Sequence, residues 1–127
     1  QAAQLRYPMD VMDILPEDTE IVIVGTAGQK ITKIGEDFHS SIEADASKVT
    51  QIVLRSHLIR TMEGLEGFAS LELLELYDNQ IEALACLGDG EHGAPGVTLR
   101  TLDMSYNVIR DMRPVELCPN LQELCKW

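Results

Sequence analysis

A glycine-rich stretch near the N-terminus contains residue types that can bind phosphate. Residues 24–30 (VGTAGQK) follow an apolar segment, as phosphate-binding loops do. Such a loop needs four residues between its two glycines and a Gly-Lys-Ser or Gly-Lys-Thr ending. Here two residues separate Gly25 from Gly28, and Gln29 stands between Gly28 and Lys30. The spacing therefore argues against a nucleotide site.

Residue types that bind metals or act as nucleophiles are scattered along the chain. His39, His57 and His92 have no cysteine at the spacing of a zinc site. Residues 89–91 (DGE) lack the further spaced oxygen ligands of a calcium loop. No serine, cysteine or carboxylate has a nearby partner in a plausible reactive site. We therefore predict no catalytic residue, no metal site, no cofactor, and a protein that is not an enzyme.

Composition and charge narrow the classes of partner. The 127 residues suffice for one small domain, and 45% of them are apolar, which permits a sizeable core. The formal net charge is −11, and such a chain repels nucleic-acid phosphates and anionic membranes. Acidity can favour a partner with a basic patch, but it can equally serve only to keep a domain in solution. No apolar stretch reaches the length of a membrane span.

The three cysteines, Cys86, Cys118 and Cys125, bear on the cellular compartment. An odd number without framework spacing argues against a disulfide scaffold and favours a reducing environment. The first residues, Gln1 to Leu15, contain two aspartates and lack the basic-then-apolar order of a secretory signal. We expect the cytoplasm and/or the nucleus, and a processed secreted chain remains the alternative.

The elements that would position any functional side chain come from an internal repeat with a step of 22 residues. One unit starts at Val49, the next at Leu71, a third at Leu99, and a fourth opens at Leu121. Their shared pattern, L-x-x-L-x-L-x-x-N-x-I-x-x-I-x-x-L, is typical of leucine-rich repeats. The L-x-L pair predicts a short strand with one buried face, and the later three-residue spacing predicts a 3₁₀ or α turn. We therefore predict an α/β fold, a leucine-rich-repeat solenoid with a parallel concave sheet and short 3₁₀/α turns on the convex side.

The predicted domain organisation follows from these starting points. Residues 1–18 form an N-terminal capping segment, with one or two helical turns between Pro8 and Leu15 in which Met9, Met12 and Ile14 cover the end of the core. The leucine-rich-repeat domain spans residues 19–127. Its units are a degenerate first repeat over 19–48, repeats over 49–70, 71–98 and 99–120, and a partial repeat over 121–127.

Two departures from the pattern predict local features. His57 stands at the asparagine position of its unit, where we expect a structural histidine that satisfies backbone groups in the turn. The step from Leu71 to Leu99 is 28 residues, and the extra residues lie within 88–96, which holds four glycines and a proline. We predict an exposed, flexible loop there, which can be shortened with little effect on stability.

Residues 54–60 (LRSHLIR), 74–81 (LELYDNQI) and 102–107 (LDMSYN) resemble the leucine-rich-repeat regulatory subunit of type-1 protein phosphatase. Residues 28–34 (GQKITKI) are similar to the first, imperfect repeat of that family. The resemblance covers about residues 19–127. Other intracellular proteins use the same unit, among them an axonemal dynein light chain and a spliceosomal protein.

The resemblance implies a curved solenoid that binds the phosphatase catalytic subunit through acidic and aromatic side chains on its concave strand face. Asp103 is the best-matched contact residue, and Glu75 is next. Cys125 stands where the family tends to have an aromatic residue, and Lys126 stands where the pattern requires a buried apolar one, so the last unit departs from the family pattern at these two positions. The family has many more repeats, so we expect this chain to be a fragment of a longer array.

The implied function is therefore a regulatory scaffold that binds the type-1 Ser/Thr phosphatase catalytic subunit. The alternatives are a scaffold for another intracellular partner, such as a dynein motor or a splicing component, or the recognition arm of a larger enzyme.

Strand alternation predicts which side chains project from the concave face. We expect Ile23, Val53 and Leu73 to form an apolar patch, with Ile21 also facing outward. Glu75 and Asp103 should lie about 5 Å apart along the sheet, where a basic partner side chain would bind between them. The predicted partner-binding residues are Val53, Arg55, Leu73, Glu75, Tyr77, Asp78, Asp103, Ser105, Tyr106, Glu123, Cys125 and Trp127.

Overall fold

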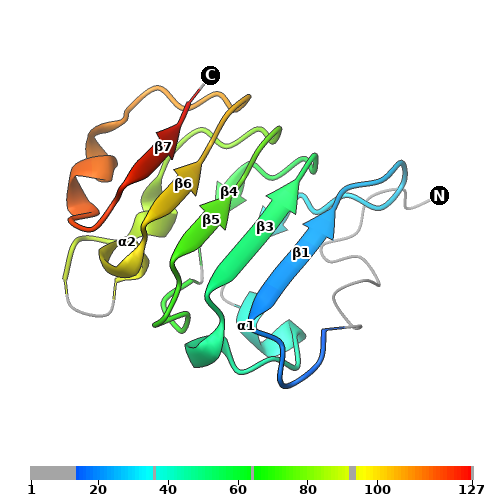
Figure 1. The fold of residues 1–127 in the computed structure, drawn as a ribbon. Coiled ribbons are helices and arrows are strands. Elements are labelled where there is room, and N and C mark those ends of the chain that lie inside the picture. The colour runs from blue at the N-terminus through cyan, green and yellow to red at the C-terminus, as the bar shows by residue number, and fades with distance from the viewer. Residues whose placement is uncertain (1–13, 36, 64, 92–93, 127) are drawn as a thin grey trace.

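A five-stranded parallel sheet organises the protein. The structure, a computed structural model, describes residues 14–35, 37–63, 65–91 and 94–126. The strand order β1-β3-β5-β6-β7 follows the chain, and Figure 1 shows the strands side by side from the blue β1 to the red β7. The strands are β1 (Glu20–Val24), β3 (Gln51–Arg55), β5 (Leu73–Glu75), β6 (Thr101–Asp103) and β7 (Glu123–Cys125). Each sequence repeat from Val49 onward contributes one strand to this sheet, and their parallel pairing confirms the prediction for these segments.

Parallel neighbouring strands need a crossover connection that returns the chain to the same end of the sheet. In this protein the connections contain short helical turns. The connections carry α1 (Phe38–Ser41), α2 (Pro95–Thr98) and the 3₁₀ turns η2 (Ala46–Lys48), η3 (Ala85–Leu87) and η4 (Arg113–Leu117). A second, two-stranded parallel sheet pairs β2 (Lys33–Ile34) with β4 (Thr61–Met62). The architecture is thus α/β with short helical turns, as predicted, and the small second sheet is an addition to the prediction.

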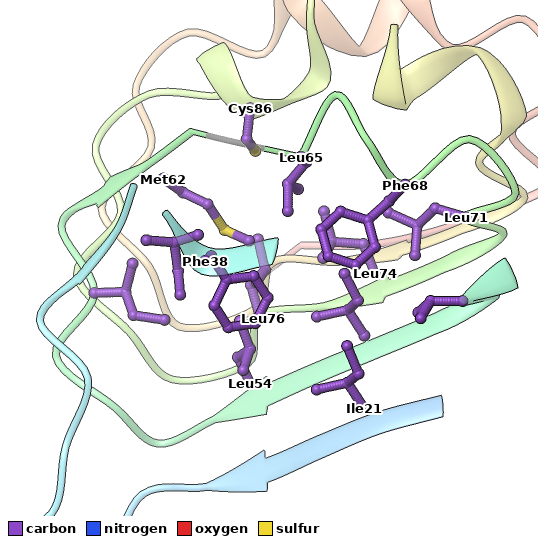
Figure 2. Packing of buried hydrophobic residues seen from close by; sticks show 14 of the residues in the cluster. Ile21, Phe38, Leu54, Met62, Leu65, Phe68, Leu71, Leu74, Leu76 and Cys86 are labelled. Carbon is purple, nitrogen blue, oxygen red and sulfur yellow. The ribbon is translucent and has the colours of Figure 1, made fainter. Parts of the chain in front are cut away.

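The hydrophobic core lies between the five-stranded sheet and these connections. Alternate strand residues such as Leu54 and Leu74 are fully buried, and Figure 2 shows them pointing toward side chains from the connecting segments. The rings of Phe38 and Phe68 pack with their centroids 6.1 Å apart. Ile14, which was predicted to cover the end of the core, is buried and belongs to the core cluster. Met9 and Met12, the other predicted capping residues, lie outside the described residues.

Asn79 joins two neighbouring repeats through its side-chain amide. Its Oδ1 accepts a hydrogen bond from the backbone N–H of Ile59 at 3.2 Å. Its Nδ2 donates to the carbonyl oxygens of Leu54 at 2.8 Å and Leu76 at 3.0 Å. One side chain therefore satisfies backbone groups on both β3 and the turn after β5, which is why the repeat needs an amide at this position.

Asn107 makes the same set of bonds one repeat later. Its Oδ1 accepts from the N–H of Ile81 at 2.9 Å, and its Nδ2 donates to the carbonyls of Leu76 at 2.9 Å and Met104 at 3.1 Å. The predicted role of the asparagine position is therefore confirmed in both repeats.

His57 occupies this position in the first clear repeat and is buried. Its Nδ1 accepts a hydrogen bond from the N–H of Ile31 at 3.0 Å, and its Nε2 lies 2.7 Å from the carbonyl oxygen of Ile23. Because Nδ1 is the acceptor, Nε2 must carry the proton and donate. Burial lowers the pKa of His57, and the nearby Lys30 charge lowers it further. The predicted structural role of His57 is confirmed.

The insertion at residues 88–96 is only partly the exposed loop that its glycines predict. Asp89, Gly90 and Glu91 are exposed, whereas Pro95 and Gly96 are buried and begin α2. A Cβ added at Gly96 would lie 2.9 Å from the Sγ of Cys118 and 2.9 Å from the carbonyl oxygen of Leu87. The prediction was wrong for this end of the insertion, because glycine here permits close packing between two connecting segments rather than an open loop.

Candidate functional site

The side of the sheet opposite the core presents a regular row of side chains. Strand pairing aligns Val22, Val53, Glu75, Asp103 and Cys125 across the five strands, and we call these residues the central row. Adjacent strands lie about 4.8 Å apart, so consecutive members of the row are close neighbours. The row changes from apolar at β1 to acidic at β5 and β6.

The apolar end of this face is formed by different residues from those predicted. Ile21 and Ile23 pair in register with Ile52 and Leu54, and all four are buried in the core. The prediction that Ile21 and Ile23 face outward was therefore wrong. A run of four β-branched residues contains no polar alternation, so the sequence of β1 alone does not reveal which set faces the core.

Val22 and Val24 are the outward apolar residues of β1, and both are exposed. Leu73 is half-buried, as part of the predicted patch should be. Val53 lies in the central row, but it is buried, with only 8% of its surface exposed, so its predicted place on the accessible surface was wrong. The predicted accessible patch of Ile23, Val53 and Leu73 is thus replaced by one centred on Val22 and Val24.

Glu75 already has a basic partner within the chain. The Nε of Arg55 donates a hydrogen bond to the Oε1 of Glu75, and the two side chains form a salt bridge between β3 and β5. Glu75 raises the pKa of Arg55, and the charge of Asp103 adds to this effect. Both residues were predicted on this face, but their pairing was not. It partly satisfies the acidic pair that we expected to bind a basic group from a partner.

Asp103 keeps part of its capacity to accept hydrogen bonds. Its Oδ1 accepts a hydrogen bond from the N–H of Ser105 at 3.0 Å, which closes a turn at the end of β6. Next to it, the hydroxyl of Thr101 donates to Glu123 at 3.3 Å. Asp103 therefore remains the half-buried carboxylate of the central row that a partner can approach.

Two tyrosines flank this charged region. The rings of Tyr77 and Tyr106 meet edge to face, with centroids 5.3 Å apart and an interplanar angle of 71°. Both were predicted as binding residues, and both are exposed, Tyr77 by 37% and Tyr106 by 59%. Asp78, which follows Tyr77, is exposed as well.

The remaining predicted residues divide into exposed and inaccessible ones. Glu123 and Cys125 are exposed on β7, as predicted. Ser105 is only 3% exposed, so its predicted place on the accessible surface was wrong. The chain has left strand geometry at this residue, and simple alternation fails beyond Asp103. Trp127 lies outside the described residues.

The glycine-rich segment after β1 forms a tight turn. The N–H of Gln29 donates to the carbonyl of Thr26 at 3.0 Å, and Gly28 adopts a φ of 84°. Gly25 is required for packing, because an added Cβ would lie 2.0 Å from the carbonyl oxygen of Ser56. Both glycines therefore have structural reasons to be there.

Other groups with potential chemistry are dispersed in the structure. Among residues 14–35, 37–63, 65–91 and 94–126, no three His, Cys, Asp or Glu side chains are grouped as metal ligands. The thiols of Cys86, Cys118 and Cys125 are free, and burial raises the pKa of Cys86 to about 12. Within the same ranges, no helix is long and apolar enough to cross a membrane.

A hollow of about 500 Å³ adjoins β7 at the edge of the sheet. Its walls include Met112, Val115 and Leu124, and Leu124 is exposed there. Comparison of the sequence with protein-family models, with curated proteins and with solved structures finds no match.

Proposed function

We propose that the protein is a leucine-rich-repeat solenoid that acts as a protein-binding scaffold through the outward face of its parallel sheet. The central row and the neighbouring pair of Tyr77 and Tyr106 carry this proposal, because they bring apolar, acidic and aromatic side chains to one region of the surface. Interfaces are enriched in such aromatic anchors next to charged groups. The repeated bonds of His57, Asn79 and Asn107 support the solenoid reading, since each fastens one repeat to the next.

We propose the type-1 protein phosphatase catalytic subunit as the partner. The resemblance of residues 54–60, 74–81 and 102–107 to the phosphatase regulatory subunit supports this choice. So does the acidity of Asp103 and Asp78 beside the tyrosine pair, together with the net charge of −11. The role is non-catalytic, and it places the protein in the cytoplasm and/or the nucleus, where its free thiols remain reduced.

Titration of purified catalytic subunit against wild-type protein and an Asp103→Lys variant tests the proposal. Charge reversal should weaken binding by about 2 kcal/mol or more, because Asp103 is part of the contact surface. A Val22→Lys variant should also bind more weakly, since it places a charge on the exposed apolar end of the face. Both substitutions are at positions not fully buried, so the fold should persist.

The matched control is Glu43→Lys, an equal charge reversal at an exposed residue on the segment between α1 and η2. It should bind like the wild type once the change in net charge is accounted for. If Asp103→Lys and Glu43→Lys lose the same binding affinity, the change in overall charge explains the loss, and Asp103 makes no specific contact. Absence of binding by the wild type would reject the phosphatase as partner.

A further inference from the structure

Within the part of the chain that the structure describes, three residues other than glycine adopt the left-handed backbone conformation, and they occupy equivalent positions of successive repeats. Ser56, Asp78 and Tyr106 have φ values of 61°, 61° and 58°. Each directly precedes the residue that fastens its repeat, which is His57, Asn79 or Asn107. Glycine adopts this conformation freely, and aspartate is found there more often than most residues. A bulky aromatic residue such as Tyr106 is exceptional at this position and calls for a compensating role.

Core packing does not provide that role for Tyr106. Its side chain is 59% exposed, and its ring contacts Tyr77 edge to face. An edge-to-face pair covers one of its four ring faces, so aromatic surface remains open to a ligand. The left-handed backbone thus holds an exposed ring against a second exposed ring on the outward side of the sheet.

The charges around this pair are predominantly negative. Asp78 is adjacent to Tyr77 and exposed, and Asp103 precedes Tyr106 by three residues at the end of β6. Arg55 lies on the β3 side of Tyr77, and its charge is paired with that of Glu75. Lys126 is the exposed cation that follows β7. Negative carboxylates beside open aromatic faces complement a planar, delocalised cation.

We propose that Tyr77 and Tyr106, together with Asp78 and Asp103, form a subsite for an arginine side chain of the protein partner. The guanidinium stacks on an open tyrosine face, and its N–H groups donate to a carboxylate. This inference rests on the proposed function, because it assigns the chemistry of the partner residue that docks on this face. It also accounts for Tyr106 in a backbone conformation that disfavours it.

A direct test uses a blocked peptide, acetyl-Ala-Arg-Ala-amide, titrated into the full chain. Its counterpart contains citrulline, which has nearly the shape of arginine but no charge. The readout is the NMR signal of labelled tyrosine rings, with Tyr7, the third tyrosine, as an internal reference. The arginine peptide should shift the Tyr77 and Tyr106 signals in a saturable manner, and the citrulline peptide should not. Equal shifts with both peptides, or none at Tyr106, would overturn the subsite.

A matched pair of glycine substitutions separates binding from folding. Tyr106→Gly removes the ring and the backbone cost together, while Ser56→Gly removes the same backbone cost away from the tyrosine pair. Tyr106→Gly should remain folded, because the relief of the backbone cost offsets part of the stability lost with the ring contact. It should nevertheless abolish the peptide-induced shift of the Tyr77 signal. It should also weaken partner binding about five- to tenfold. Ser56→Gly should retain both.

The outcomes distinguish this subsite from the wider proposal. If the wild type shows no affinity for the phosphatase catalytic subunit but the arginine peptide still shifts both tyrosines, the partner assignment fails and the subsite stands. If the phosphatase binds wild type and Tyr106→Gly equally and the peptide gives no selective shift, the scaffold function stands and the subsite fails.

Discussion

The imidazole of His57 accepts a hydrogen bond from the backbone N–H of Ile31, which lies 26 residues earlier in the chain, at 3.0 Å. The same ring donates to the carbonyl of Ile23 at the end of β1. A buried histidine that uses its unprotonated nitrogen as an acceptor loses that bond when it is protonated. The attachment of the first repeat is therefore sensitive to pH, whereas the asparagines of the later repeats are not.

The stability of the protein should fall below about pH 6.5 because of His57. The pKa of His57 is lowered in the folded state, so in this range the unfolded chain binds more protons than the folded one. The contribution is complete above the unfolded pKa and declines as the pH drops below it. Urea unfolding of the wild type and of His57→Asn at about pH 7.5 and about pH 5 measures this difference.

His57→Asn is the matched control, because asparagine occupies the equivalent position at Asn79 and Asn107. It should fold at neutral pH and lose less stability on acidification than the wild type. The carboxylates and the other histidines contribute equally to both proteins. Parallel loss of stability in the two proteins would contradict the role of His57.

Asn107→Ala should lower the free energy of unfolding by about 1–3 kcal/mol, because it removes the side-chain partner of the Ile81 N–H and of the Met104 carbonyl and one of the two amide donors to the Leu76 carbonyl. Denaturant unfolding followed by circular dichroism measures the change. Asn120→Ala is the comparison, since Asn120 is exposed and its amide bonds the carbonyl of Val97. If both variants lose equally little stability, water replaces the hydrogen bonds of Asn107, and its predicted contribution to stability is wrong.

Gly96→Ala should destabilise the protein by about 1–3 kcal/mol, because the new methyl group would meet a backbone oxygen that cannot easily move. Glu91→Ala lies in the exposed part of the same insertion and should change stability by less than about 0.5 kcal/mol. Thermal unfolding of both variants provides the measurement. If Gly96→Ala leaves the stability unchanged, the backbone around α2 can shift to accommodate the methyl group at little cost.

The cysteines should differ sharply in reactivity toward a disulfide reagent at about pH 8. Cys125 is exposed and should react at once in the folded protein. Cys86 and Cys118 are buried, and burial raises the pKa of each thiol, so they should react on unfolding. Removal of the fast phase by Cys125→Ser identifies it. Fast reaction of that variant in the native state would indicate frequent opening of the region around η3 and η4.

The repeat spacing by itself determined the strands, their parallel order and the fastening residues of this protein. Apolar residues two positions apart predict a strand, and the pattern returns after 22 residues, or after 28 where the insertion lies, with an amide or imidazole at one position. Such features are local, so they can be read from the chain without knowing what packs against it. The outward positions of Glu75 and Asp103 follow from the same local alternation along β5 and β6.

Where that regular pattern gives no signal, only the tertiary structure decided which residues are buried and which side chains pair. Ile21 and Val22 have nearly the same preference for a strand, and the pairing with β3 selects which one enters the core. The partnership of Arg55 with Glu75 depends on two side chains that meet between neighbouring strands. Gly96 belongs to the packing of α2 because Leu87 and Cys118 approach it from other segments. These outcomes arise from contacts between residues far apart in the sequence. The energies of such contacts cannot be predicted from the sequence of any one segment.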